Sequence, residues 1–148
     1  MDDQAWDRIS GDYYSEILSP LKDSKHNPLI DDLQALKSKK LSVIELGCGL
    51  GELIPFLEEN FRAVTAIDFS QEMISQAKTR SARSSTNFQV MDIADTIGMD
   101  ASFDVAVAVN SIILSSLVKL NQMIRTVFKI LKPGGRLFAI IPAMESYI

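Results

Sequence analysis

Short apolar runs alternate with amphipathic stretches along the chain from about residue 40 onward. The apolar runs are rich in β-branched residues and have few polar interruptions, as in LSVIEL and FDVAVAV. Strands that are covered on both faces of a parallel sheet have this near-continuous apolar pattern. The pattern therefore predicts five buried strands, at residues 41–46, 63–67, 87–91, 103–109 and 136–141.

Helices are expected between these strands, at residues 52–60, 70–82 and 115–131. The sequence KPGG at 132–135 ends the last helix, because Pro133 cannot continue it and Gly134 or Gly135 can take a positive φ. Residues 92–102 link the third strand to the fourth and leave room for a short helix or only a loop. In the last helix the apolar residues fall at helical spacing: Leu117, Leu120, Ile124, Val127, Phe128 and Leu131.

Two further helices are expected near residues 3–17 and 28–38. We therefore divide the chain into an N-terminal helical cap, residues 1–40, and a core, residues 41–148, within a single domain overall. Repeated strand–helix–strand units predict an α/β fold with an open, doubly wound, mainly parallel sheet and helices on both faces. Ligands of such sheets bind beyond the carboxyl ends of the strands. The sequence GCGLG follows the first expected strand at that position.

This loop carries glycines at alternate positions, 47, 49 and 51, where they allow a sharp turn and a close approach of a ligand to the backbone. A phosphate-binding Walker loop needs Gly-Lys-Ser/Thr, which is absent here. The dinucleotide motif G-x-G-x-x-G would place its third glycine at position 52, which is Glu52. A carboxylate there is a poor neighbour for a pyrophosphate at the start of a helix. The loop therefore predicts a ligand without phosphates at this point.

Composition narrows the classes of partner. The chain has 148 residues, a formal net charge of −4 and a pI of about 4.9, which disfavours nucleic acid or an anionic membrane as a partner. The basic cluster KSKK, residues 37–40, is interpreted as a solvated helix end. No secretory signal and no apolar run of about 18 residues is found, so no membrane span is expected. One cysteine, Cys48, excludes an intramolecular disulfide, disfavours a Cys/His metal site, and fits a reducing, cytoplasmic setting.

The sequence VIELGCGLGE resembles the first motif, E/D-x-G-x-G-x-G, of class I S-adenosylmethionine-dependent methyltransferases. Further segments resemble the second to fifth strands of that family, in the family's order: AVTAIDFSQEMISQAK, FQVMDIAD, FDVAVAVNSIILSSL and ILKPGGRLFAIIP. The resemblance covers roughly residues 41–142. It implies a Rossmann-like core with strand order 3-2-1-4-5. It also implies S-adenosyl-L-methionine as cofactor and S-adenosyl-L-homocysteine as product.

The resemblance also implies roles for individual residues. Asp68 would accept hydrogen bonds from the ribose hydroxyls, Phe69 would lie against the adenine, and Asp92 would accept from the adenine amino group. Asn110 would help to hold the methionine portion, and Tyr13 or Tyr14 would cover the cofactor. The complete set of expected cofactor-binding residues is Glu45, Gly47, Cys48, Gly49, Gly51, Asp68, Phe69, Asp92, Ile93, Asn110 and Tyr14.

Charge supports this cofactor independently. S-adenosylmethionine carries a sulfonium and an ammonium group, and three acids, Glu45, Asp68 and Asp92, lie at or near strand ends.

Simpler interpretations stay open at this point. The three glycines would form a plain turn, the two aspartates would cap helices, and Glu45 would only order the loop. Cys48 is interpreted as a small residue packed in the turn, Ser111 is left open with Asn110, and His26 is placed on the surface.

The expected reaction is direct displacement at the sulfonium methyl, with a small-molecule acceptor by default. The fourth strand ends in VNSI, unlike the D/N-P-P-Y/F/W of amino-methylating enzymes, and no Pro-Cys pair indicates cytosine methylation. No residue is assigned as a catalytic base, and no metal is expected. The alternatives are a non-catalytic module that binds the cofactor in a larger assembly and, less favoured, a nicotinamide-dependent oxidoreductase.

The family's sheet continues past the fifth strand, whereas this chain stops soon after it. We therefore expect an open edge and an apolar surface at the fifth strand, covered by a homodimer partner or by a missing C-terminal segment.

Overall fold

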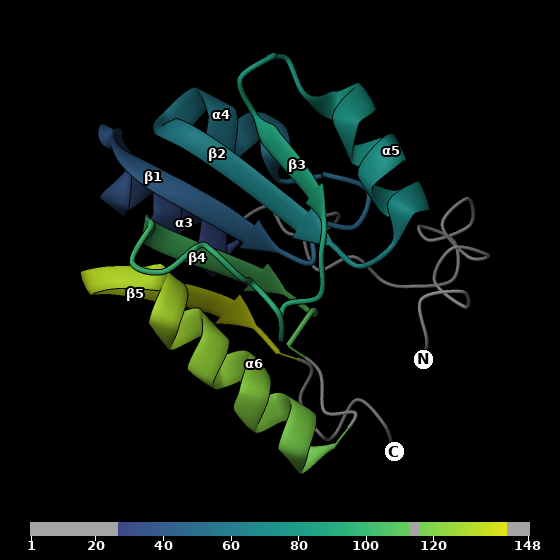
Figure 1. Cartoon of the computed structure of the whole chain (residues 1–148). Helices are drawn as coiled ribbons and strands as arrows, with labels where there is room; N and C mark the ends of the chain where they lie inside the picture. Colours follow the sequence, from purple (N-terminus) through teal and green to yellow (C-terminus); the bar gives the residue numbers. More distant parts are fainter. Residues whose placement is uncertain (1–26, 113–115, 142–148) are drawn as a thin grey trace.

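A five-stranded parallel sheet forms the centre of the protein (Figure 1). The computed structural model describes residues 27–112 and 116–141. The strand order is β3-β2-β1-β4-β5, so the predicted doubly wound α/β fold is confirmed. The strands are β1 (Ser38–Leu46), β2 (Phe61–Asp68), β3 (Asn87–Val90), β4 (Phe103–Val109) and β5 (Leu131–Ile140).

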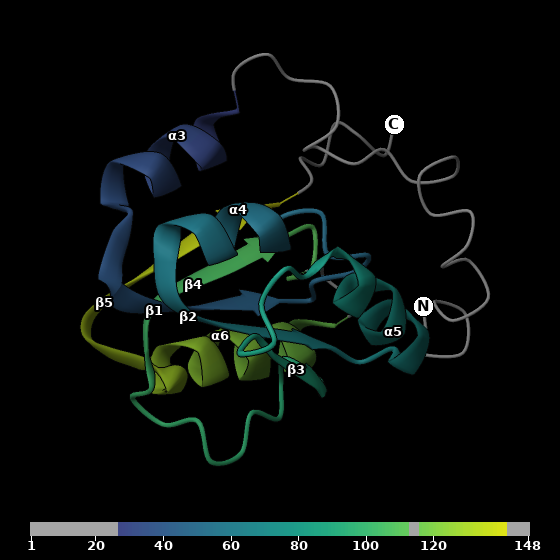
Figure 2. The same cartoon turned by 90° about the horizontal axis from the view of Figure 1, so that it is seen from above.

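Helices cover both faces of this sheet (Figure 2). One face packs against α3 (Pro28–Leu36), α4 (Ile54–Asn60) and α5 (Gln71–Arg80), and the other against α6 (Leu117–Ile130). Alternation along β1 divides its side chains between the two faces, because successive residues of a strand point in opposite directions. Val43 lies in the core beneath α3 and α4, whereas Ile44 and Leu46 lie in the core beneath α6.

Side-chain caps fix where three of the helices begin. Asn27 accepts a hydrogen bond from the backbone of Leu29 at the start of α3, and Ser70 and Ser116 cap α5 and α6 in the same manner. Such caps satisfy N–H groups that have no partner inside the helix. Because α5 and α6 follow β2 and β4, their starts lie on the same side of the sheet as the strand ends.

The basic cluster at residues 37–40 was wrongly interpreted as a helix end. Helix α3 ends at Leu36, and β1 begins at Ser38, with Lys39 and Lys40 exposed. The Lys39 ammonium donates to the backbone carbonyls of Glu58 and Glu59 in the last turn of α4. Cations are stabilised at the carboxyl end of a helix, which explains a lysine on this strand.

Two other segments differ in detail from the expectation. Residues 91–102, between β3 and β4, form turns without a helix. The KPGG sequence is part of β5, where the pairing with β4 shifts between Leu131 and Arg136. Gly134 has φ +79° at this irregularity, so the turn chemistry was predicted although its place inside the strand was not. The helix expected at 3–17, which contains Tyr13 and Tyr14, lies outside the described residues, and so does His26.

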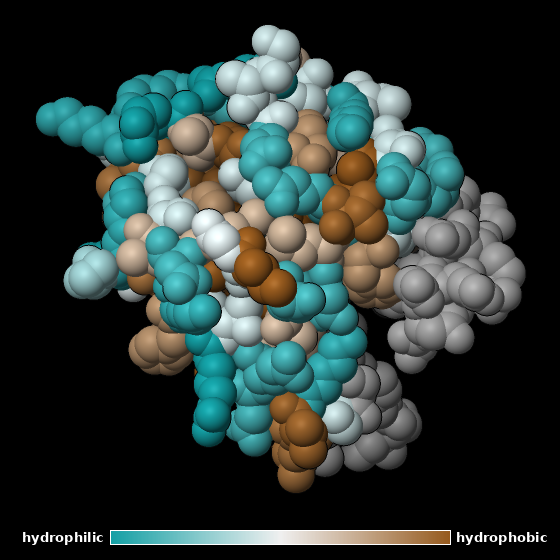
Figure 3. Space-filling view, viewed as in Figure 1, coloured by the Kyte–Doolittle hydropathy of each residue, from teal (hydrophilic) through white to brown (hydrophobic). Residues whose placement is uncertain are grey.

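The edge strand β5 pairs with β4 and has no second neighbour among the described residues. Ile124 and Phe128 of α6 and Leu137 of β5 are exposed, whereas Met123 and Val127 of α6 are buried against the sheet. Figure 3 also shows a brown apolar patch at the lower end of α6, where the exposed residues are Leu117 and Val118. Exposed apolar side chains are therefore present on both α6 and β5.

No helix in residues 27–112 or 116–141 has the length and apolarity that a membrane span requires.

Candidate cofactor site

The glycine loop turns sharply at the carboxyl end of β1. The backbone N–H groups of Gly47 and Cys48 both donate to the carbonyl of Ile67 in β2, at 2.8 and 2.9 Å. Gly51 donates to the carbonyl of Cys48 at 2.9 Å, which closes the turn before α4. Glycines 47, 49 and 51 all have positive φ, between +51° and +77°, a region that other residues enter only with strain.

Packing explains two of these glycines, and open space distinguishes the third. A Cβ on Gly47 would lie 2.4 Å from the Cβ of Ser111, and a Cβ on Gly51 would lie 2.9 Å from the Cα and Cβ of Ala77. A Cβ on Gly49 would meet no atom within 4 Å. Gly49 therefore faces the space where a ligand would approach the backbone.

Asp68 connects the end of β2 to this loop. One carboxylate oxygen, Oδ2, accepts from the backbone N–H of Gly49 at 2.9 Å, and Oδ1 accepts from that of Ser70 at 2.9 Å. The side chain is buried. Ser70, and not Asp68, caps α5, so the capping interpretation of Asp68 is wrong. Asp68 instead holds the glycine loop, through Gly49, against the end of β2.

Glu45 is a buried carboxylate beneath the loop. Its Oε2 atom is fully buried and has no hydrogen-bond partner among the described residues. Burial raises the pKa of Glu45 well above its ordinary value, and the nearby carboxylates of Asp68 and Glu52 raise it further. A buried acceptor without a donor is unfavourable, and a cationic or hydrogen-bonding ligand would satisfy it.

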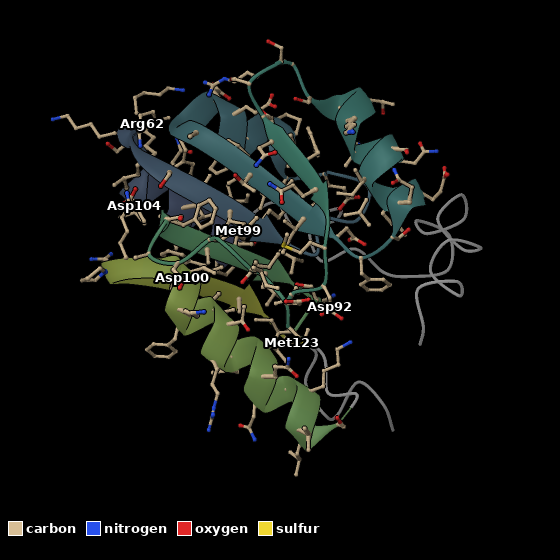
Figure 4. All side chains as sticks on the ribbon, in the orientation of Figure 1. Arg62, Asp92, Met99, Asp100, Asp104 and Met123 are labelled. Carbon is tan, nitrogen blue, oxygen red and sulfur yellow. The ribbon has the colours of Figure 1, made fainter. Side chains whose placement is uncertain are left out.

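The residues expected to contact adenine lie beyond β2 and β3. Phe69 follows Asp68 directly, and its side chain is 38% exposed. Asp92 lies after β3, near the carboxyl ends of the strands, whereas Asp104 lies at their opposite ends (Figure 4). Oδ1 of Asp92 accepts from the backbone of Ala94, and Oδ2 accepts from the ammonium of Lys119, each at 2.9 Å. Ile93 is buried in the core beneath α6.

Asp92 is held in its ionised form. Partial burial alone raises the pKa of Asp92, but the hydrogen bonds from Lys119 and Ala94, with the charge of Lys119, lower it below its ordinary value. Asp92 therefore remains a hydrogen-bond acceptor at neutral pH.

Asn110 and Ser111 lie where β4 ends beside the loop. Asn110 has φ +52°, and its backbone N–H donates to the carbonyl of Ile140 at 2.9 Å. The Ser111 hydroxyl donates to the carbonyl of Leu46 and packs on Gly47. Cys48 is buried in the core, and burial raises the pKa of its thiol, which disfavours a nucleophilic thiolate.

Lys119 is the contact that sequence reasoning missed. It lies in the first turn of α6, where the helix dipole disfavours a cation, and that turn contains no acidic residue. A lysine at a position that the helix dipole disfavours is the signal that a nearby acid stabilises it.

No group of three or more His, Cys, Asp or Glu residues suited to a metal occurs in the described part of the chain.

A doubly wound sheet with a glycine turn and acidic residues at its central strand ends defines a Rossmann-like ligand-binding domain. The methyltransferase domain family matches residues 43–135 of this chain, more than half of its length. The chain therefore belongs to the class I S-adenosylmethionine-dependent methyltransferases, a family whose cofactor is S-adenosyl-L-methionine. The unpartnered Glu45 oxygen and the open space at Gly49 fit a cationic ligand that lies close to the backbone.

Two curated relatives align with nearly the whole chain. Malonyl-[acyl-carrier protein] O-methyltransferase of Bacillus anthracis is 30% identical over 141 residues, covering 94% of this chain and 51% of that protein. Ubiquinone biosynthesis O-methyltransferase of Pseudomonas fluorescens is 31% identical over 140 residues, covering 90% and 55%. The chain thus spans about half the length of these relatives.

A solved structure shows the same fold. Phosphoethanolamine N-methyltransferase 1 of Haemonchus contortus, in complex with phosphoethanolamine and S-adenosylhomocysteine, is similar with a TM-score of 0.79. The two chains are 18% identical, and the match covers 95% of this chain and 31% of that one.

Proposed function

We propose that this chain binds S-adenosylmethionine at the glycine loop and forms the cofactor-binding part of an enzyme that methylates a small molecule. The observation that carries the proposal is the buried, unpartnered Oε2 of Glu45, beside the carboxylate of Asp68. This arrangement favours a cation over a pyrophosphate, because a cation would stabilise the ionised form of Glu45, whereas a pyrophosphate would disfavour that form further and repel the carboxylate of Asp68. It therefore supports the sulfonium cofactor over a nicotinamide dinucleotide.

The proposed roles follow the positions around the loop. Gly49 lets the methionine portion and ribose approach the backbone, between the required turns at Gly47 and Gly51. Asp68 accepts from the ribose hydroxyls while it retains its hydrogen bonds to the loop. Asp92 accepts from the adenine amino group. The remaining proposed contacts are Glu45, Cys48, Phe69, Ile93, Asn110 and Tyr14.

The cofactor supplies an already activated methyl group, so the protein's main task is to align the acceptor with it and to exclude water. A base is needed only for an acceptor that must lose a proton at physiological pH. We assign that role to no residue. Glu45, Asp68 and Asp92 are binding groups, and none of them is proposed to react.

A small-molecule acceptor is supported by the name of one relative, that of ubiquinone biosynthesis, and by charge. The two curated relatives are named as O-methyltransferases, one of ubiquinone biosynthesis and one of an acyl group on a carrier protein. The net charge of −4 disfavours a polyanionic acceptor such as nucleic acid.

We further propose that the apolar surface of Ile124, Phe128 and Leu137 is covered in the working protein. A second copy of the chain or a further segment of polypeptide would bury these side chains beside the open edge of β5.

Calorimetric titration with S-adenosylmethionine, S-adenosylhomocysteine and NAD tests the cofactor proposal. We expect micromolar binding of the first two, no binding of NAD, and at least about tenfold weaker binding by Asp68→Asn, since hydrogen bonds to charged groups are the stronger ones. Asp104→Asn is the matched control, because Asp104 also binds a backbone N–H, that of Ser42, but at the opposite end of the sheet.

The alternatives have distinct outcomes. A folded protein that binds NAD instead would support the oxidoreductase, and one that binds none of the three would contradict the proposed site. Cofactor binding without methyl transfer to any acceptor, tested in the longest natural form of the protein, would indicate the non-catalytic module.

A further inference from the structure

One flank of helix α6 holds the turn that carries Asp92. Lys119 Nζ donates to Asp92 Oδ2 at 2.9 Å, and Gln122 Nε2 and Thr126 Oγ1 donate to the carbonyl of Ala94 at 3.3 and 3.2 Å. These helix positions are three and four residues apart and therefore share one face. The turn also closes on itself, because Asp95 N–H donates to the Asp92 carbonyl at 2.9 Å. Helix α6 thus holds this turn through the side chains of Lys119, Gln122 and Thr126.

Lys119 and Ala94 together restrain both oxygens of Asp92. The backbone N–H of Ala94 binds Oδ1, and the Lys119 ammonium binds Oδ2. A carboxylate held at both oxygens has a fixed plane, yet each oxygen retains a second lone pair for a further donor. Asp92 is partly exposed, so a ligand beyond β3 can reach it (Figure 4).

We propose that Lys119 is a positioning residue that sets the selectivity of the site for adenine by holding the Asp92 carboxylate. This inference rests on the proposed cofactor site. An oriented acceptor favours a base that presents an amino group, and it rejects one that presents a carbonyl oxygen, because two acceptors face each other without a proton. A carboxylate without Lys119 can rotate away from the mismatch, so the rejection weakens.

A structural role alone would predict little effect. The Lys119–Asp92 pair is exposed, with side-chain exposures of 45% and 38%, and such pairs contribute little to folding. Lys129, on the same helix, forms a comparable pair with Asp100 of the segment between β3 and β4, at 3.3 Å, with exposures of 67% and 57%. Lys129 lies ten residues further along α6, about 15 Å at the usual helical rise. Lys129→Met is therefore a matched control.

The test compares two ligands that differ along the C6–N1 edge of the base. S-adenosylhomocysteine has an amino group on C6 and a bare N1, whereas S-inosylhomocysteine has a carbonyl oxygen on C6 and a proton on N1. We would measure Kd for both by calorimetry in the wild type, Lys119→Met, Lys119→Arg, Lys129→Met and Asp92→Asn. We expect the wild type to prefer the amino compound by on the order of 100-fold, as a mismatch at a charged acceptor implies.

Lys119→Met should reduce this preference about three- to tenfold, with an unchanged melting temperature. Lys119→Arg should restore most of it, because arginine also donates to carboxylates. Lys129→Met should leave it unchanged, and Asp92→Asn should abolish it.

Three outcomes separate the inference from the proposal beneath it. If Lys119→Met keeps the full preference while Asp92→Asn loses it, Lys119 has no positioning role. If Asp92→Asn also keeps the preference, Asp92 does not contact the base, and the inference fails while cofactor binding stands. If the folded wild type binds neither compound, the proposed cofactor site is itself wrong.

Discussion

Alanine substitutions at Gly49 and Gly51 should separate the part of the glycine loop that serves the ligand from the part that serves the fold. Both residues have positive φ, +51° and +77°. A methyl group at position 49 would enter open space, whereas one at position 51 would lie 2.9 Å from the Cα and Cβ of Ala77 in α5. The same chemical change therefore has two different physical consequences.

The expected loss of stability follows from these surroundings. Holding an alanine in the left-handed region costs about 1–2 kcal/mol at either position. At position 51 the contact with α5 adds about 1–3 kcal/mol of overpacking, because the opposing atoms include backbone that cannot rotate away. We thus expect Gly49→Ala to lower the free energy of unfolding by about 1–2 kcal/mol, and Gly51→Ala by about 2–5 kcal/mol.

Binding should show the opposite order. Gly49→Ala places a methyl group where the backbone would approach the cofactor, so we expect at least about a tenfold loss of affinity for S-adenosylhomocysteine. Gly51→Ala should bind more tightly than Gly49→Ala once the folded fraction is taken into account. Urea unfolding followed by circular dichroism gives the stabilities, and calorimetry gives the affinities. Wild-type affinity in a folded Gly49→Ala variant would refute the argument that this open space receives the ligand.

Three further predictions concern buried carboxylates and the exposed surface. Because the folded-state pKa of Glu45 is raised, the stability of the wild type should fall as pH rises above about 4.3. At pH 8, Glu45→Gln should therefore be roughly 1 kcal/mol more stable than the wild type. The same variant should bind the cofactor more weakly. Lower stability of this variant in urea at pH 8 would contradict the reasoning. The Glu58 pKa is raised by burial but lowered overall by hydrogen bonds from Ser81, Thr86 and Ala82. The contribution of Glu58 to stability should be complete above about pH 4.3 and should be lost as pH falls through the folded-state pKa. At pH 7, Glu58→Gln should lower the free energy of unfolding, measured in urea, by about 1–3 kcal/mol. Equal stability of the variant and the wild type would contradict this. Phe128→Glu should reduce self-association measured by light scattering at high concentration, and a wild-type chain that stays monomeric would argue against a dimer at this surface.

The sequence predicted the elements that depend on local pattern. All five strands occur near the expected positions, and the three central ones, β1, β2 and β4, are buried apolar runs as predicted. The expectation that all five are buried is wrong for β3 and β5, because these strands lie at the edges of the sheet. The acids at the ends of β1 and β2 were likewise indicated by the family resemblance and by their positions at strand ends. Asp68 does lie beside the loop, since Gly49 N–H binds its carboxylate.

Contacts between distant segments were beyond local pattern. Lys39 was assigned to a helix end because its neighbours are basic, whereas its partners are carbonyls of α4 that only the folded sheet brings near. Lys119 was likewise counted as part of an amphipathic helix, and its partner Asp92 lies 27 residues earlier. The different reasons for the three glycines depend on Ser111 and Ala77, which the glycine spacing does not indicate.

The role of Glu45 becomes clear when it is compared with Glu58 and Asp104, two other acids that are buried or half-buried. Glu58 is buried and receives hydrogen bonds from Ser81, Thr86 and the backbone of Ala82. Asp104 receives them from Ser42 and Lys132. Only buried acids with such donors are stable as anions, and the pKa values of both groups lie below their ordinary range. Glu45 departs from this rule at the position where the loop also leaves open space beside Gly49. Since leaving an acceptor unsatisfied lowers stability, its presence here is best explained by a donor that arrives with the ligand.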